Sequence, residues 1–148
     1  VEAVIRTTLL SVISLSLAAA GVLQARRGGT LAVISSIAGD RGRPGNVIYS
    51  AAKGGVNVFL EGLREKLRGA GVQVLTIKPG FVATPMLAAM PSASRLAERW
   101  LTAPPERVGR DIYRAIIRRR AVLYTPWFWR PIMALVRALP AAMYRRCG

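Results

Sequence analysis

Apolar residues along the chain fall into blocks that predict buried strands and amphipathic helices in turn. Residues 30–35 and 72–77 are short, mostly apolar runs, as expected of strands that are buried on both faces of a parallel sheet. Between them, apolar positions within 49–69 recur at steps of three and four residues, which places them in one buried helical stripe. These positions are Val56, Phe59, Leu60, Leu63 and Leu67.

Further elements complete this pattern. Residues 2–27 predict a long helix, a short helix is expected around 85–99, a longer one around 105–119, and a strand at 121–124. The alternation of helices and strands predicts an α/β fold, in which a parallel sheet has helices on both faces. Ligands of such sheets bind beyond the carboxyl ends of the strands. The chemistry is therefore expected after Ser35-Ser36 and after Lys78-Pro79-Gly80.

The first predicted helix contains an uncharged stretch of 19 residues, 7–25, between Arg6 and Arg26. Its length is close to the roughly 20 apolar residues that cross a membrane. However, the stretch carries several hydroxyl groups and leads through a short glycine turn into a strand. We therefore predict a buried helix of an α/β domain, and a membrane span is the alternative.

Charge and composition limit the chemistry. The chain has 22 Lys and Arg against 7 Asp and Glu, a net charge of +15, and residues 106–148 hold ten Arg against Glu106 and Asp111. This bias favours an anionic partner such as nucleic acid, an acidic membrane or a phosphorylated substrate. The chain has no histidine, so we predict no zinc or other metal site and no Ser-His or Cys-His nucleophile pair.

Tyr49 and Lys53 lie four positions apart at the start of the second long helix, so their side chains share one face. An ammonium group near a phenol favours the phenolate, and so does a helix N-terminus. We therefore expect the pKa of Tyr49 to lie below its ordinary value of about 10. Such a tyrosine can donate a proton to a carbonyl oxygen or accept one from an alcohol. Ser36, thirteen positions earlier at a strand end, can place its hydroxyl on the same oxygen.

A lone Tyr-x-x-x-Lys pair is common in helices, but here three segments occur together. They are Ile-Ser-Ser-Ile-Ala-Gly at 34–39, Tyr-Ser-Ala-Ala-Lys-Gly-Gly at 49–55, and Lys-Pro-Gly-Phe-Val-Ala-Thr-Pro-Met at 78–86. In residue type, order and spacing they resemble the short-chain dehydrogenase/reductase superfamily. The resemblance covers 1–125 and implies the C-terminal, catalytic part of a single domain with a Rossmann-like, doubly wound parallel sheet.

The resemblance also implies a role for each matching residue. Ser36 resembles the serine that orients the substrate, Tyr49 the general acid/base, and Lys53 the residue that binds the nicotinamide ribose and lowers the tyrosine pKa. Four residues match the loop that holds the nicotinamide carboxamide and a nearby phosphate, and these are Pro79, Gly80, Val82 and Thr84. Gly80 would let the backbone approach the cofactor. The implied cofactor is NADP or NAD, and the implied reaction moves hydride between it and a carbonyl or secondary alcohol.

Two departures from the family pattern are visible. No G-x-x-x-G-x-G occurs, so the Gly-rich βαβ units that bind the pyrophosphate are absent from the sequence, and we expect them upstream of Val1. The family's catalytic asparagine aligns with Thr8, which lacks the two-sided hydrogen bonding of an amide. The alternative is therefore a truncated, non-catalytic remnant that serves as an interaction or membrane-surface module.

Residues 126–148 are predicted to form an amphipathic, basic helix or tail. The segment holds Trp127 and Trp129 among apolar residues and ends in a basic pair, Arg145-Arg146. Trp and Arg together are typical of a lipid interface, although a helix that closes the sheet or a dimer contact is the favoured interpretation. This ending resembles the subgroup that includes the decaprenylphosphoryl-2-keto-ribose reductases, whose substrate is linked to a lipid.

The expected partners follow from these patterns. Nucleic acid is not expected, because the aromatic residues cluster in the tail and do not alternate with basic residues on a strand. We expect a small-molecule or lipid-linked carbonyl substrate and, by analogy with the family, a homo-oligomer. The expected location is cytoplasmic, with peripheral contact at the inner face of the membrane through the tail as an option; no secretory signal is recognised. The choice between NAD and NADP stays open.

Overall fold

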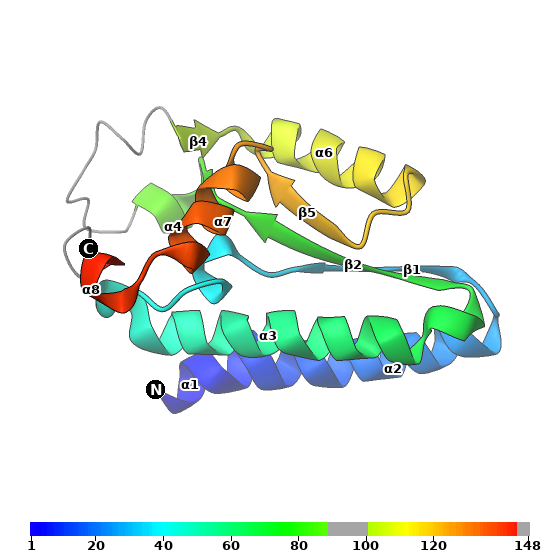
Figure 1. Ribbon diagram of the computed structural model, residues 1–148. Helices are drawn as coiled ribbons and strands as arrows, with labels where there is room; N and C mark the ends of the chain where they lie inside the picture. The colour runs from blue at the N-terminus through cyan, green and yellow to red at the C-terminus, as the bar shows by residue number, and fades with distance from the viewer. Residues whose placement is uncertain (89–100, 145–148) are drawn as a thin grey trace.

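The computed structural model describes residues 1–88 and 101–144, and its centre is a parallel sheet (Figure 1). Strands β1 (Gly29–Ile34), β2 (Val72–Pro79) and β5 (Val122–Thr125) pair in the order β1-β2-β5. Two short strands, β3 (Phe81–Val82) and β4 (Thr102–Ala103), form a separate parallel pair that the sequence did not predict. The predicted α/β fold with a parallel sheet is confirmed.

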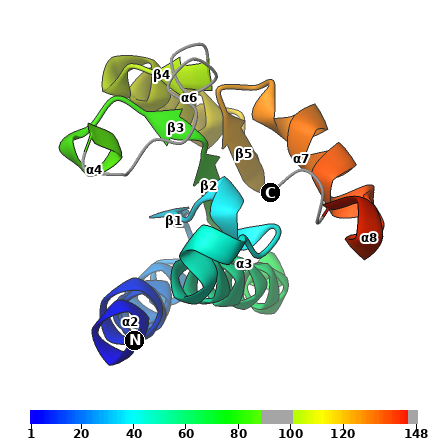
Figure 2. The ribbon, with the colours of Figure 1, turned by 90° about the vertical axis from the view of Figure 1, so that its left-hand side faces the viewer.

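Helices cover this sheet on both faces (Figure 2). On one side, α1 (Glu2–Ile5), a π-helical segment (Arg6–Leu10) and α2 (Ser11–Ala25) form one continuous helix beside α3 (Val47–Lys66). On the other side lies α6 (Pro105–Ile117), while α7 (Trp129–Ala138) and α8 (Ala141–Tyr144) follow β5. The three predicted long helices are confirmed, with their ends shifted by a few residues. Of the helix expected around 85–99, α4 (Pro85–Ala88) is seen, and the rest lies outside the described residues.

Strand β2 is buried along nearly its whole length because helices cover both of its faces. Successive side chains of a strand point to opposite faces. Accordingly, Val74 packs with Leu60 of α3, whereas Leu75 and Ile77 pack with Ala115 of α6. This packing fixes the direction of β2, and with it the position of the loop that follows its carboxyl end.

Strand β1 corrects the prediction of burial on both faces. Each of its residues is either partly buried or exposed, and Ile34 is 59% exposed. The reason is topological: α6 packs on β2 and β5, so it leaves the outward face of β1 uncovered. In addition, β1 pairs only with β2, and the described residues contain no strand along its other edge.

The helix over Glu2–Ala25 also differs from the buried helix that the sequence predicts. One stripe, with Ser16 and Ala20, is buried, but Leu15 is 71% exposed, and other apolar side chains of the same helix are exposed as well. Among the described helices, this is the one that is long and apolar enough to cross a membrane by length and composition. A contiguous exposed apolar surface on a protein marks a site of interaction.

The segment after β5 packs over the carboxyl end of the sheet. Trp129 and Met133 of α7 are buried together with Ile37, which directly follows Ser36. Arg41, in the loop before α3, donates hydrogen bonds to carbonyl oxygens at the end of α7, among them that of Leu139 at 2.7 Å. Its guanidinium also lies 4.2 Å from the ring centroid of Tyr144. Helix α7 therefore forms one wall of the region where the predicted chemistry lies.

Candidate active site

The folding of the chain brings the predicted residues to one end of the sheet. Ser36 follows the end of β1, and Pro79 and Gly80 lie at the end of β2. Helix α3 begins at Val47 after a 3-10 turn, Pro44–Asn46, and carries Tyr49 and Lys53 in its first two turns. Because β1 and β2 are parallel, their carboxyl ends lie at the same edge, and α3 starts there.

Ser36 is held by the turn that it begins. Its backbone is extended, and its Oγ accepts a hydrogen bond of 3.1 Å from the backbone N–H of Ala38, at the start of the 3-10 turn Ile37–Gly39. This bond restrains the Ser36 side chain in the way that a capping bond does at the start of a helix. The Ser36 hydroxyl also acts on the phenol of Tyr49, whose pKa it lowers.

The pKa of Tyr49 corrects the prediction from the sequence. Burial of the phenol is the dominant effect and raises its pKa above the ordinary value, while the Ser36 hydroxyl offsets only part of that rise. Burial disfavours the charged phenolate, and this effect is not visible in the spacing of Tyr49 and Lys53. In this structure Tyr49 is therefore a protonated group at neutral pH, which suits donation of a proton.

Lys53 lies between Tyr49 and the end of β1. Its Nζ is 5.7 Å from the centroid of the Tyr49 ring and donates a hydrogen bond of 3.1 Å to the carbonyl oxygen of Ile34. Burial lowers the pKa of Lys53, because desolvation penalises the ammonium form. An ammonium has three donors, so the bond to Ile34 leaves others for a ligand hydroxyl at this edge.

Gly39 allows the serine turn to lie directly against α3. A Cβ on Gly39 would stand 2.6 Å from the carbonyl carbon and oxygen of Lys53 and 2.7 Å from Nδ2 of Asn57. Any side chain here would force the turn away from the helix. Gly39 therefore sets the close approach between the turn that holds Ser36 and the helix that holds Tyr49.

Gly80, in the loop after β2, lies directly against α7. A Cβ at Gly80 would stand 1.9 Å from Nε1 of Trp129, so the glycine is required by this contact, and its approach to a cofactor stays a prediction. The space beside Gly80 is thus filled by the indole of α7. Trp129 is 4% exposed, and its N–H has no hydrogen-bond partner within the part of the chain that the structure describes. Further along the loop, Val82 is half-buried and Thr84 is exposed, with its Oγ1 3.3 Å from the carbonyl oxygen of Val82.

A buried charged cluster, which was not predicted from the sequence, lies behind the serine turn. Nζ of Lys78 lies 2.5 Å from Oδ1 of Asp40, and their side chains are 11% and 2% exposed. The hydroxyl of Tyr124 donates to Oδ2 of Asp40 at 2.7 Å. One signal was available: Lys78 is a charge at the end of an apolar strand, and such a residue is almost never buried unless it is paired.

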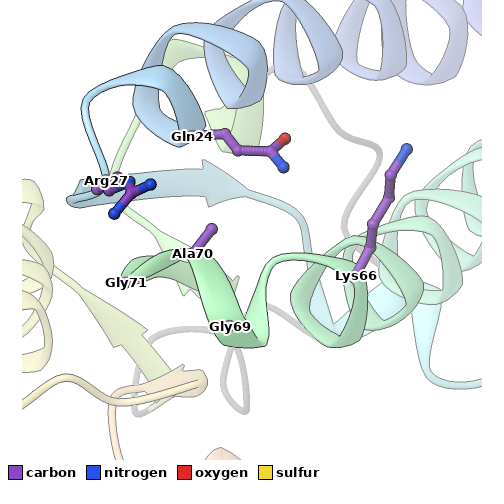
Figure 3. A pocket seen from close by; sticks show the side chains of 6 residues that line it. All are labelled: Gln24, Arg27, Lys66, Gly69, Ala70 and Gly71. Carbon is purple, nitrogen blue, oxygen red and sulfur yellow. The ribbon is translucent and has the colours of Figure 1, made fainter.

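A basic depression of about 660 Å³ lies elsewhere, at the other end of the sheet (Figure 3). It is lined by Gln24, Arg27, Lys66, Gly69, Ala70 and Gly71. Lys66 is thirteen residues after Lys53 on α3, which is roughly 20 Å along the helix axis. The basic side chains that line the depression, Arg27 and Lys66, are exposed to solvent. This depression is therefore separate from the candidate active site.

The parallel sheet and the Ser36–Tyr49–Lys53 arrangement at its carboxyl end define a class of protein: an α/β domain of the Rossmann type with a serine, a tyrosine and a lysine in its candidate site. The sequence model of the short chain dehydrogenase family matches residues 1–95. The chain belongs to this family.

Relatives and a solved structure agree with this assignment. The chain is 35% identical over 144 residues to an uncharacterised oxidoreductase of Mycobacterium tuberculosis and 32% identical over 143 residues to one of Streptomyces coelicolor. Each match covers 97% of this chain but 55% and 54% of the respective relative. The chain thus spans about half the length of the curated relatives it matches.

A short chain dehydrogenase from Burkholderia cenocepacia, solved in complex with NADP, has a similar fold, with a TM-score of 0.79 and 19% sequence identity. The match covers 96% of this chain and 56% of the solved one. At 19% identity this similarity supports the fold alone.

Proposed function

We propose that this chain forms the catalytic half of an oxidoreductase that moves a hydride between NADP or NAD and a carbonyl or secondary alcohol. The observation that carries the proposal is that Ser36, Tyr49 and Lys53 lie together at the carboxyl end of the sheet, with the Lys53 Nζ 5.7 Å from the Tyr49 ring centroid and bonded to the end of β1. Membership of the short chain dehydrogenase family and relatives named oxidoreductases support it.

The residues at this edge fit a nicotinamide ribose. Lys53 is fixed by the carbonyl oxygen of Ile34 and has further donors for ribose hydroxyls, and the Tyr49 phenol lies next to it. The loop with Pro79, Gly80, Val82 and Thr84 would hold the carboxamide side. When bound, the reduced nicotinamide supplies the hydride. The Burkholderia short chain dehydrogenase and a gluconate 5-dehydrogenase of similar fold were both solved with NADP.

A site for the pyrophosphate part of the cofactor is not recognised in these 148 residues, because they contain no G-x-x-x-G-x-G sequence. We propose that this part of the site is supplied by chain outside this sequence. The free edge of β1 is where further strands of the same sheet would pair. Activity is accordingly proposed for the intact protein that contains both halves.

In the proposed reaction the Ser36 and Tyr49 hydroxyls both meet the carbonyl oxygen of the substrate. As the carbonyl carbon accepts the hydride, Tyr49 donates its phenolic proton to the oxygen, so that C=O becomes CH–OH and a phenolate is left. The phenolate then takes a proton from solvent. Lys53, 5.7 Å from the ring, stabilises the negative charge during this interval. Oxidation of an alcohol runs through the same groups in reverse.

The direct test follows NADPH and NADH absorbance in the intact protein with a set of aliphatic, cyclic and sugar ketones. Turnover that the Tyr49→Phe variant loses would establish the proposal. If neither wild type nor variant consumes either cofactor although wild type is folded, the oxidoreductase proposal is wrong. The alternative would then hold: a non-catalytic relative in which Thr8 stands at the position of the family's asparagine.

A homo-oligomer is part of the proposal, and the exposed apolar face of α2 and α3 supports it. Leu15 of α2 and Val58 of α3 are 71% and 70% exposed, and Leu10, Leu17 and Val22 of the first long helix are also exposed. A second copy that packs the same two helices against this face would cover these side chains, and light scattering of the intact protein measures whether it does.

Contact with an anionic membrane surface and a lipid-linked carbonyl substrate are the finer part of the proposal. Trp127, two residues before α7, is 71% exposed, and Arg130, in the first turn of α7, is exposed as well. Exposed Trp beside Arg suits a lipid headgroup region. Sedimentation with phosphatidylglycerol vesicles, but not with phosphatidylcholine vesicles, is expected, and Trp127→Ala should weaken it. No sedimentation with either would contradict this part alone.

A further inference from the structure

Helix α3 presents a third polar side chain in line with Tyr49 and Lys53. Asn57 follows Lys53 by four residues, as Lys53 follows Tyr49, so all three lie on one face of the helix. Asn57 contacts both flanks of the serine turn. Its Oδ1 accepts a hydrogen bond of 2.6 Å from Oγ of Ser35, and its Nδ2 donates one of 3.3 Å to Oδ1 of Asp40. The helix that carries Tyr49 thus grips the turn on either side of Ser36.

The turn between these two flanks is a short, internally bonded unit. The backbone N–H of Gly39 donates to the carbonyl oxygen of Ser36 at 3.2 Å, and that of Asp40 to the carbonyl oxygen of Ile37 at 3.1 Å. Ser36 Oγ is bonded to the N–H of Ala38 within the same unit. These bonds tie Ser36 and Asp40 into one turn, so we expect a displacement of Asp40 to move Ser36 as well.

Asp40 is anchored from the opposite side by the sheet. Lys78 at the end of β2 pairs with Oδ1, and Tyr124 of β5 donates to Oδ2. Nζ of Lys78 and the Tyr124 hydroxyl lie 3.5 Å apart. The Asp40 carboxylate therefore receives hydrogen bonds from α3, β2 and β5 at once. Desolvation of the two charges of a buried ion pair offsets most of their attraction. A gain in stability therefore does not explain why Asp40 and Lys78 are buried, and another role is expected.

We propose that Asp40 and Asn57 are positioning residues for the Ser36 hydroxyl. Asn57 sets the serine turn in register with the helix face that carries Tyr49, while Lys78 and Tyr124 hold Asp40 against the sheet. The turn is thereby clamped where the Ser36 hydroxyl meets the Tyr49 phenol. The predicted effect of these two residues on turnover rests on the proposed function.

The test uses the intact protein with the variants Asp40→Asn and Asn57→Ala. Tyrosine labelled with ¹³C at Cζ reports the titration of Tyr49 by NMR, and Tyr49→Phe assigns the signal. Because the Ser36 hydroxyl lowers the pKa of Tyr49, Ser36→Ala should shift the titration to higher pH. Asp40→Asn and Asn57→Ala should shift it in the same direction. Turnover should fall on the order of 10²-fold, as for a misplaced catalytic group, while the KM for NADPH stays within about twofold.

Glu65→Gln is the matched control, since it removes a carboxylate on the same helix that pairs at the surface with Arg68. It should change neither the titration nor the turnover. The proposal is overturned if Asp40→Asn and Asn57→Ala reduce thermal stability but leave the Tyr49 titration at its wild-type position. If Asp40→Asn does not fold, Asn57→Ala decides, because it keeps the Asp40–Lys78 pair. Absence of turnover in wild type would refute the proposed function, whereas the NMR comparison still decides the role of Asp40 and Asn57.

Discussion

Two regions of this molecule depart from the usual distribution of polar and apolar side chains, and they do so in opposite ways. At the carboxyl end of the sheet, Asp40 and Lys78 are charged and buried. On the outer surface of α2 and α3, Leu15 and Val58 are apolar and exposed. The first region is satisfied by partners within the chain, since each charge meets a hydrogen-bonding group. The apolar side chains of the second region are not buried by any of the described residues. This region is therefore the one expected to bind another protein surface.

The largest effect is expected where the buried polar region meets the substrate. Tyr49→Phe removes the phenolic proton and keeps the ring, so turnover should fall by about 10²- to 10⁴-fold, the range for a general acid/base. Binding of NADPH should be nearly unchanged, because Lys53 keeps its bond to Ile34. Steady-state rates together with fluorescence titration of NADPH measure both quantities. A folded variant that loses binding would contradict the role given to Tyr49.

The buried pair itself should matter more to folding than a surface pair does. Lys78→Met leaves the Asp40 carboxylate buried without its counter-ion, which typically costs about 3–5 kcal/mol of the free energy of unfolding. The comparison is Arg68→Met, which breaks the exposed pair with Glu65 and should cost roughly 0–1 kcal/mol. Urea unfolding of the intact protein measures the two. Equal losses would mean that burial of Asp40 and Lys78 has no energetic consequence.

The next largest effect is expected on stability, at the contact between Gly80 in the loop after β2 and Trp129 of α7. Gly80→Ala places a methyl group 1.9 Å from the present position of Nε1 of Trp129, so the indole must move. Overpacking of this kind costs about 1–3 kcal/mol. In contrast, a Cβ at Gly62 of α3 would meet nothing within 4 Å, so Gly62→Ala should stabilise the helix by about 1 kcal/mol. Thermal unfolding should show opposite signs, and a Gly80→Ala variant as stable as wild type would refute the contact.

The smallest effect concerns the exposed apolar region. Leu15→Asp adds a charge that a second copy would have to bury, and we expect the dimer dissociation constant to rise about tenfold, or roughly 1.4 kcal/mol. Tyr113→Asp is the control, because Tyr113 is 67% exposed on α6, away from α2 and α3. Sedimentation equilibrium measures the association. A dimer weakened equally by both changes would show that α2 and α3 are not its interface.

Much of the fold follows from local sequence patterns. The helices over Glu2–Ala25 and Val47–Lys66 and the strands β1 and β2 could be predicted, because periodicity and glycine turns report on nearby residues only. The three segments that resemble the family fall at the ends of β1 and β2 and at the start of α3, so the location of the candidate site was also predictable.

Features that depend on contacts between distant residues could not be predicted from the sequence. Asp40 and Lys78 are 38 positions apart and Gly80 and Trp129 are 49 apart, and no local pattern connects such pairs. The direction of the Tyr49 pKa shift was predicted wrongly, because the sequence gives the spacing to Lys53 but not the degree of burial. Likewise, the apolar run at 7–25 predicts a helix without saying what covers its outer side.

The most direct test of the central claim is a fluorescence titration of the intact protein with NADPH and NADH, in wild type and in the Lys53→Ala variant. We predict saturable binding of one or both cofactors to wild type and binding at least about tenfold weaker in Lys53→Ala, which corresponds to roughly 1.4 kcal/mol or more. Failure of folded wild type to bind either cofactor, or binding by Lys53→Ala as tight as that of wild type, would contradict the assignment of this edge of the sheet to the nicotinamide ribose.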